Sequence, residues 1–210
     1  IIFYGEKLWI SETDVINPVK IVPDTLTLDN YSRLSQSSDG CRMYFAANKD
    51  IYQITYPDIG LTRITDAKDG RFLNPILSTD DNTITYLSHR QLKGQKDYSM
   101  TACYMLLDVS NSYELPQLGQ YCHNVVHRLS DNRLYYNRLN FGTLSCDLNG
   151  DNVQQIGSYG SDTSPLFGLS HNERFLIVKD SKLWVYDLVI GNHIEISVLQ
   201  GSRTNLICSL

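Results

Sequence analysis

The chain has 210 residues, of which 42% are hydrophobic and 20% are charged, and its formal net charge at pH 7 is -5. Nonspecific nucleic-acid binding requires a basic face, so we expect no nucleic-acid partner. The negative charge also argues against an anionic membrane surface. No apolar run approaches the roughly 18 residues of a membrane helix, so we expect no membrane insertion and a single domain over residues 1–210.

The first 22 residues predict three strands, at 1–4, 7–10 and 19–22. They resemble a unit of the repeat described below that lacks its first strand. Neither an initiator Met nor a signal peptide precedes the first strand. We therefore expect a mature form or an excised domain.

Four copies of one sequence motif follow. Each consists of an apolar strand that ends in Leu-Ser, a polar turn and a second apolar strand. The Leu-Ser pairs stand at 34–35, 77–78, 129–130 and 169–170. The steps between successive Leu residues are 43, 52 and 40 residues. A period of about 40–50 residues with several short strands per unit is typical of propeller blades.

A third and a fourth strand complete each repeat. The third strands are predicted at 50–56, 101–109, 143–148 and 182–188, and the fourth at 61–65, 113–118, 153–157 and 193–197. Turns rich in Gly, Asn and Asp, such as 149–152, lie between them and supply the positive φ angles of tight hairpins. The sequence therefore predicts four antiparallel strands per unit, named a to d from the propeller axis outward.

The C-terminal residues 205–210 have the pattern of an unattached strand a. Such a strand could complete the first unit and close the ring, which would remove exposed sheet edges. We therefore predict an all-β protein, a β-propeller of five four-stranded blades closed by the C-terminal strand. The alternative is a fragment of a larger propeller, in which Leu210 begins another blade.

One repeat carries a resemblance to a known family. Its residues are Leu34-Ser35, Ser38-Asp39-Gly40, Tyr44-Phe45, Ile51-Tyr52 and Arg63-Ile64-Thr65. This motif resembles the WD40-like (PD40) repeats of the TolB propeller family. The resemblance implies a propeller and an exported, periplasmic or extracellular setting, but propellers of this type dock partners, assist enzymes or bind sugars.

Five cysteines are spread along the chain without any Cys-x-x-Cys pair, so we expect no structural zinc site. One disulfide is possible, between Cys103 and Cys122. The alternative is buried free thiols, and cysteines without clear pairing favour a reducing compartment.

The b–c and d–a loops form the face on which propellers usually carry function. The longest b–c loop, 89–98, concentrates three cations, so an acidic partner would suit it. The alternative is a solvated hairpin tip. The candidate binding residues in this loop are His89, Arg90, Lys93, Lys96 and Tyr98.

The following blade offers further candidates. Arg138, Asn140 and Phe141 lie in its b–c loop, and Tyr121 and His123 lie on the d–a loop before it. Arg and exposed aromatic residues are typical interface anchors, although Phe141 could instead pack between blades. His123 and His127 span about 13 Å if they lie on a strand, so they need not converge and we expect no metal.

No complete catalytic motif is present. The serines of the Leu-Ser pairs, Ser35, Ser78, Ser130 and Ser170, recur in every repeat, which indicates a structural role in the turn; no Gly-x-Ser-x-Gly elbow exists. We therefore predict a noncatalytic propeller that docks a protein partner and needs no cofactor. The alternative is a carbohydrate-active enzyme, or an accessory or lectin domain, for which two or three carboxylates or repeated sugar sites would be needed.

Overall fold

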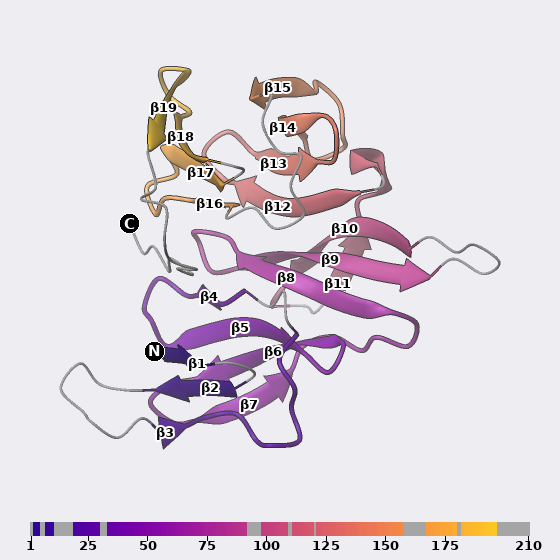
Figure 1. The fold of residues 1–210 in the computed structure, drawn as a ribbon, viewed down its shortest axis with the longest axis vertical. Coiled ribbons are helices and arrows are strands. Elements are labelled where there is room, and N and C mark those ends of the chain that lie inside the picture. The colour runs from indigo at the N-terminus through magenta and orange to yellow at the C-terminus, as the bar shows by residue number, and fades with distance from the viewer. Residues whose placement is uncertain are drawn as a thin grey trace.

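The computed structural model describes residues 2–4, 7–10, 19–29, 33–91, 98–108, 111–119, 121–157, 167–179 and 182–196. These residues form five antiparallel sheets, which follow one another along the chain (Figure 1). The first sheet has three strands: β1 (Ile2–Tyr4), β2 (Lys7–Ile10) and β3 (Val19–Lys20). The part of the chain that is described contains no helix that could cross a membrane.

Four four-stranded blades follow the first sheet. The second blade contains β4 (Ser35–Gln36), β5 (Arg42–Ala47), β6 (Asp50–Thr55) and β7 (Gly60–Arg63). The third contains β8 (Arg71–Leu77), β9 (Thr83–Gln91), β10 (Tyr98–Leu106) and β11 (Asn111–Glu114), followed by the 3-10 turn η1 (Pro116–Leu118). The fourth contains β12 (Cys122–Arg128), β13 (Arg133–Arg138), β14 (Gly142–Asp147) and β15 (Gln154–Gly157). The fifth contains β16 (Phe167–Leu169), β17 (Phe175–Lys179), β18 (Leu183–Asp187) and β19 (Asn192–Ile196).

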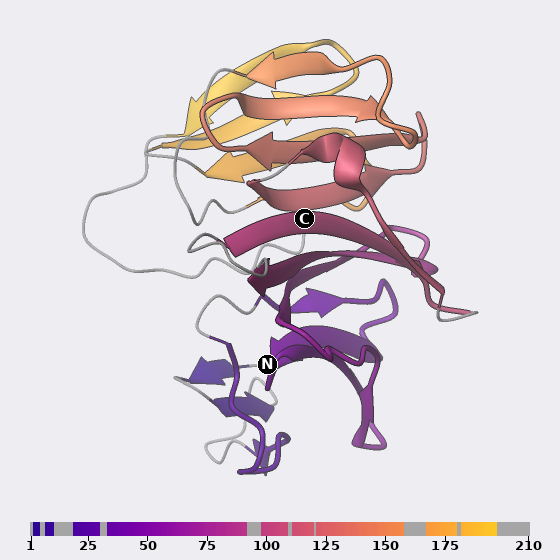
Figure 2. The ribbon, with the colours of Figure 1, turned by 90° about the vertical axis from the view of Figure 1, so that its right-hand side faces the viewer.

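The blades are arranged as in a propeller, which confirms the predicted fold class. In the second, fourth and fifth blades the inner strands β4, β12 and β16 lie toward the middle of the molecule, and the later strands of these blades lie progressively outward (Figure 1). Figure 2 shows the stack of blades from the side. Contacts of β5 with β8, β9 with β12 and β12 with β16 join consecutive blades.

The predicted count of five four-stranded blades is corrected to four. In the described part of the chain the first sheet has only three strands, all from residues 1–22. The closing strand predicted at 205–210 lies outside the described residues. Ring closure therefore stays a prediction.

The second, third and fourth blades are apolar on both faces because each of them lies between two others. In β5, Met43 and Phe45 pack in a core with Leu8 of the first sheet. The alternate residue Tyr44 packs with Ile84 of the third blade. The period of two in a strand thus sends neighbouring side chains into two different cores, and the strands read as nearly continuous hydrophobic runs.

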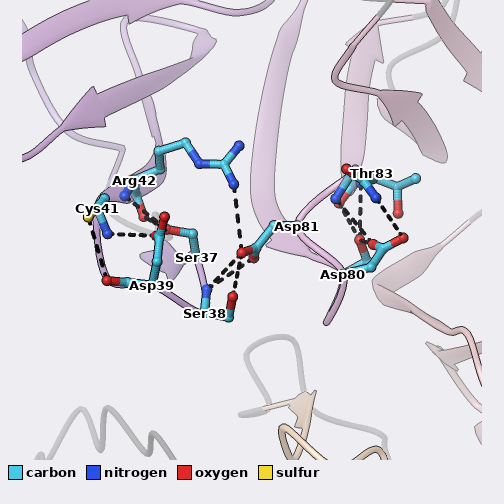
Figure 3. A network of polar contacts seen from close by, with 10 residues as sticks. Ser37, Ser38, Asp39, Cys41, Arg42, Asp80, Asp81 and Thr83 are labelled. Carbon is cyan, nitrogen blue, oxygen red and sulfur yellow. Dashed lines mark hydrogen bonds and ion pairs between the residues drawn. The ribbon is translucent and has the colours of Figure 1, made fainter.

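The a–b turns share one hydrogen-bonding scheme. In the third blade the Ser78 hydroxyl accepts the N–H of Thr83 at 3.0 Å, and Asp80 Oδ1 accepts the N–H of Asn82 at 3.1 Å (Figure 3). The fifth blade repeats the scheme, since the Ser170 hydroxyl accepts the N–H of Phe175 at 2.9 Å. The structural role predicted for these two serines is confirmed.

In the other two blades the predicted turn serine was wrong. The second blade uses Ser37, whose hydroxyl accepts the N–H of Arg42 at 2.9 Å, rather than Ser35. Ser35 lies in β4, where its hydroxyl accepts the N–H of Leu77 in the third blade at 2.8 Å. In the fourth blade Leu129 occupies the serine position, because its C=O accepts the N–H of Asn132, the residue with positive φ. The turn geometry, not the Leu-Ser pair, sets the register of the repeat.

Acidic residues of the a–b turns also clamp one blade to another. Asp81 has a left-handed φ of 59°, and its carboxylate accepts the Ser38 N–H at 3.0 and 3.1 Å and the Ser38 hydroxyl at 2.7 Å (Figure 3). Glu173, with φ 57°, accepts the N–H groups of Leu129 at 3.1 Å and Ser130 at 2.8 Å. In each case a turn of one blade holds the turn of the preceding blade.

The disulfide that the sequence left possible between Cys103 and Cys122 does not form, because both thiols are free and buried. Cys103 lies in the core between the second and third blades, whereas Cys122 lies in the core between the third and fourth. The two thiols are therefore on opposite sides of the third blade. The alternative of buried free thiols holds for Cys103, Cys122 and Cys146, while Cys41 is exposed.

Candidate functional site

The described residues among those predicted to bind lie at one end of the third and fourth blades. In the third blade Arg71, which begins β8, pairs with His89 of β9. In the fourth blade Cys122, which begins β12, pairs with Arg138 at the end of β13. Because β8 and β12 run from this end to the a–b turns, the candidate residues lie on the face opposite the turn clamps. We call this end of the two blades the rim.

Four residues of the long loop predicted at 89–98, namely 89–91 and 98, lie in strands, and residues 92–97 lie outside the described residues. β9 extends to Gln91 and β10 begins at Tyr98, and these two residues pair with each other. His89, Arg90 and Tyr98 therefore lie on a long hairpin rather than in a loop, which corrects that expectation. An antiparallel ladder can continue past the sheet wherever both strands supply residues of strand propensity. Lys93 and Lys96 lie outside the described residues.

The charges of the third blade at the rim have partners within the molecule. Arg71 Nε donates to His89 Nδ1 at 3.1 Å, and Arg71 lies 3.4 Å from Asp29. Burial lowers the pKa of His89, and the charge of Arg71 lowers it further, so the ring is neutral at pH 7. Arg90 lies 2.8 Å from Glu114. Arg71 and Arg90 thus each have a carboxylate nearby within the molecule.

Phe141 stands on a tight turn between β13 and β14. Its N–H donates to the Arg138 C=O at 3.0 Å, and its own C=O accepts from Gln155 Nε2 at 3.3 Å. The flanking Asn140 and Gly142 have positive φ angles of 66° and 86°. This backbone presents the Phe141 ring to solvent, with 54% of the residue exposed, so the alternative that Phe141 packs between blades is wrong.

Arg138 lies against this ring. Its guanidinium carbon is 4.4 Å from the centroid of Phe141, in a cation–π contact. On its other side it meets Gly119, where an added Cβ would lie 3.0 Å from the guanidinium. Gly119 has φ 80° and ψ 172°, a conformation that essentially only glycine adopts. Among the described residues no carboxylate forms an ion pair with Arg138.

Tyr121 completes this group. It is exposed, with φ 66°, and its C=O accepts the N–H of Leu139 at 3.2 Å. This bond ties the start of β12 to the turn that carries Phe141. We call the resulting group the rim patch; it consists of Tyr121, Arg138, Asn140 and Phe141.

His123 is separated from this patch by its burial. It lies in a β-bulge of β12. Asn74 lies in another bulge, in β8, the inner strand of the preceding blade. Asn74 Nδ2 donates to the His123 C=O at 3.4 Å, whereas His123 Nε2 has no hydrogen-bond partner among the described residues. Burial lowers the pKa of His123, so the ring is neutral at pH 7. The bulge in β8 was not predicted, although the Asn74-Pro75 pair within a strand is a sequence signal for one.

The two neighbouring histidines do not converge. His127 Nε2 lies 3.0 Å from Asn132 Oδ1, near the a–b turn at the far end of β12. His123 lies at the rim end of the same strand. Within the described ranges no three His, Cys, Asp or Glu side chains come close enough to hold a metal ion.

Comparisons with solved structures agree with this architecture. TolB from Acinetobacter baumannii superposes with a TM-score of 0.64 at 14% identity, over 91% of this chain and 49% of that one. A putative TolB from Agrobacterium tumefaciens gives a TM-score of 0.65 at 17% identity, over 91% and 73%. The chain has the fold of a TolB-type β-propeller. The resemblance drawn from its repeats is confirmed at the level of fold.

The same fold also occurs in an enzyme. An oligogalacturonate lyase in complex with manganese superposes with a TM-score of 0.63 at 8% identity, over 89% of this chain and 57% of that one. The chain thus spans about half the length of the lyase and of the Acinetobacter TolB. No protein-family model and no curated protein sequence matches the chain. At these identities the similarity establishes the fold alone.

Proposed function

We propose that this propeller is a noncatalytic docking module that binds a protein partner through the rim patch. The observation that carries the proposal is the pairing of Arg138 with the solvent-exposed ring of Phe141. Arg and aromatic residues dominate the binding energy of protein interfaces, especially when they are held in place before the partner arrives. Here Gly119, Tyr121 and the hydrogen bonds of the turn hold them.

The charge of the patch also favours a particular partner. Arg90 and Arg71 have carboxylates beside them, whereas Arg138 has none among the described residues. A planar guanidinium whose donors are not used by a carboxylate is suited to a carboxylate of another molecule. We therefore expect the partner to bring an acidic group next to an apolar surface.

The test is a pull-down from extract of the source cells, with Arg138→Ala combined with Phe141→Ala. The matched control is Tyr113→Ala combined with Val153→Ala, because these two side chains are exposed to a degree similar to Phe141 but lie outside the rim patch. We expect the wild type and the control to retain the same protein and the rim variant to lose it. A partner retained equally by all three would refute the choice of surface.

The alternative is a role in carbohydrate chemistry. It is favoured by two buried groups at the bulges, His123 Nε2 and Asn74 Oδ1, which have no hydrogen-bond partner in the described part of the chain, since bulges often lie next to active sites. If no protein is retained, a thermal-shift screen with glycans and divalent cations follows. A shift with a glycan that His123→Ala abolishes would favour this alternative. The expected exported, periplasmic or extracellular setting is part of the proposal under either function.

A further inference from the structure

Three polar residues join the second and third blades at their rim end. Arg71, the first residue of β8, donates from Nε to His89 Nδ1 of β9 at 3.1 Å and from Nη1 to Asp29 Oδ1 at 3.4 Å. Asp29 precedes the second blade, and its N–H donates to the C=O of Ala46 in β5 at 3.2 Å. One guanidinium thus bridges a residue held by the second blade and a residue of the third. We call Asp29, Arg71 and His89 the rim latch.

The strand pairing of the third blade fixes the position of the rim latch. Arg71 and His89 are directly opposite each other in the ladder of β8 and β9. Gly70, with φ 98°, comes so close to β9 that an added Cβ would collide with the C=O of His89. The Phe72 N–H donates across the blades to the C=O of Lys49 at 2.8 Å. The two blades therefore approach each other directly beside the latch.

The bond to Arg71 requires a neutral His89. A guanidinium has donors and no acceptor, so His89 Nδ1 must supply a lone pair and the ring proton must lie on Nε2. Protonation of the ring would place the second proton on Nδ1. It would remove the acceptor and set an imidazolium against a guanidinium. The latch can therefore exist only while His89 is uncharged.

The surroundings of His89 keep the ring uncharged at pH 7. Burial lowers the pKa of His89, the charge of Arg71 lowers it further, and the charge of Asp29 raises it. On β9 itself the next residue, Arg90, is 2.8 Å from Glu114 of β11. On β10 the residue opposite His89 is Met100, which is uncharged.

We propose that the rim latch is an acid-sensitive contact between the second and third blades, which opens when His89 takes up a proton. Opening leaves Arg71 bound to Asp29 alone, so the two blades lose a bridge at the rim. The clamp at the opposite end of these blades uses Asp81 and Ser38 and contains no histidine. The latch shares no residue with the rim patch, so it can be tested whether or not a docking partner is found.

The first test follows the ring of His89 by NMR during a pH titration, with its signals assigned through the backbone. We expect Nδ1 to be the unprotonated nitrogen at pH 7 and the titration midpoint to lie below the ordinary pKa of 6.5. Arg71→Gln removes the neighbouring cation and should raise the midpoint, whereas Asp29→Asn removes the carboxylate and should lower it. A ring protonated on Nδ1 at pH 7, a midpoint at or above the ordinary value, or a midpoint that neither variant moves would each overturn the proposal.

The second test compares the wild type with His89→Asn, whose Oδ1 can take the place of Nδ1 and accept from Arg71 without titrating. Because folding lowers the pKa of His89, the stability it adds is complete above the unfolded value of 6.5 and is lost as the pH falls through the folded value. The Tm of the wild type should therefore fall more from pH 7 to pH 5 than the Tm of His89→Asn. The other histidines are common to both proteins, so their contributions cancel in the difference.

Hydrogen exchange then shows where the wild type opens. After correction for the intrinsic exchange rate, protection of the Phe72 N–H should decrease from pH 7 to pH 5 in the wild type and stay constant in His89→Asn. The matched amide is that of Leu107, which donates to the C=O of Asn82 at 2.9 Å at the a–b end of the third blade and should stay protected. Equal pH dependence in the two proteins, or an equal loss of protection at both amides, would refute a latch confined to the rim.

Discussion

Replacing Glu173 with alanine removes an acceptor that serves two other blades. Its carboxylate accepts the N–H groups of Leu129 and Ser130 in the fourth blade, and the hydroxyl of Thr79 in the third. Glu173 is only 7% exposed. Leaving a buried donor without its acceptor costs about 1–3 kcal/mol, and we take the lower end because the turn of Leu129 and Ser130 is partly open to water.

The three lost bonds together predict a loss of about 2–3 kcal/mol in the free energy of unfolding, at roughly 1 kcal/mol each. For a chain of this size that corresponds to a fall of about 4–12 °C in Tm. Glu173→Gln keeps one accepting oxygen but turns an amide N–H₂ toward a backbone donor, so we expect a loss of about 1 kcal/mol.

Differential scanning calorimetry and urea unfolding of the three proteins measure these losses. The control is Glu114→Ala, which removes only the exposed pair with Arg90 and should cost less than about 0.5 kcal/mol. The reasoning is refuted if Glu173→Ala and Glu114→Ala have the same Tm. It is also refuted if Glu173→Gln is as damaging as Glu173→Ala, because the loss would then not depend on the remaining acceptor.

Three further predictions concern acid stability, strain at the rim and thiol reactivity. Burial alone would raise the pKa of Glu173, but its hydrogen bonds from Thr79, Leu129 and Ser130 outweigh this and hold the pKa below its usual value. The stability it adds is therefore present above pH about 4.3 and is lost as the pH falls further, so the Tm difference between wild type and Glu173→Gln should shrink from pH 7 to pH 3. Gly119→Ala should cost about 1–3 kcal/mol of strain and weaken partner capture, measured by Tm and pull-down; unchanged capture would mean that Gly119 does not position Arg138. Burial raises the pKa of Cys103 to about 12 and that of Cys146 to about 11, so a thiol reagent at pH 8 should modify Cys41 and leave these two unmodified until the protein is unfolded, as mass spectrometry would show.

The fold could be predicted from the sequence because the strands and turns of each repeat have a recognisable pattern of apolar and polar residues. Cores on both sides of a blade require apolar residues at consecutive positions, as in 43–47. Polar turns of fixed length separate these runs. The pattern depends on local properties alone, so it needs no knowledge of which blades touch.

The errors concern relations between blades. Ser35 and Ser37 are both plausible turn serines in the sequence, and only the hydrogen bonds of the folded turn distinguish them. Cys103 and Cys122 are close along the chain, but their side chains lie in two different cores, on opposite sides of the third blade, so they cannot form a disulfide. The rim patch was found from residue type, whereas the bulge that places Asn74 beside His123 depends on the pairing of β8 with β9.

The two ends of the blades differ in how much change they can accept. At the a–b turns, Asp81 and Glu173 bind backbone groups of a neighbouring blade, so substitutions there disturb the arrangement of the whole propeller. At the rim, Phe141 and Tyr121 are held by bonds within their own blade and its preceding loop, and their side chains face solvent. A binding surface can vary only where the fold does not depend on it. The residues that join neighbouring blades through the a–b turns thus lie at the end opposite the rim, where we propose that the partner binds.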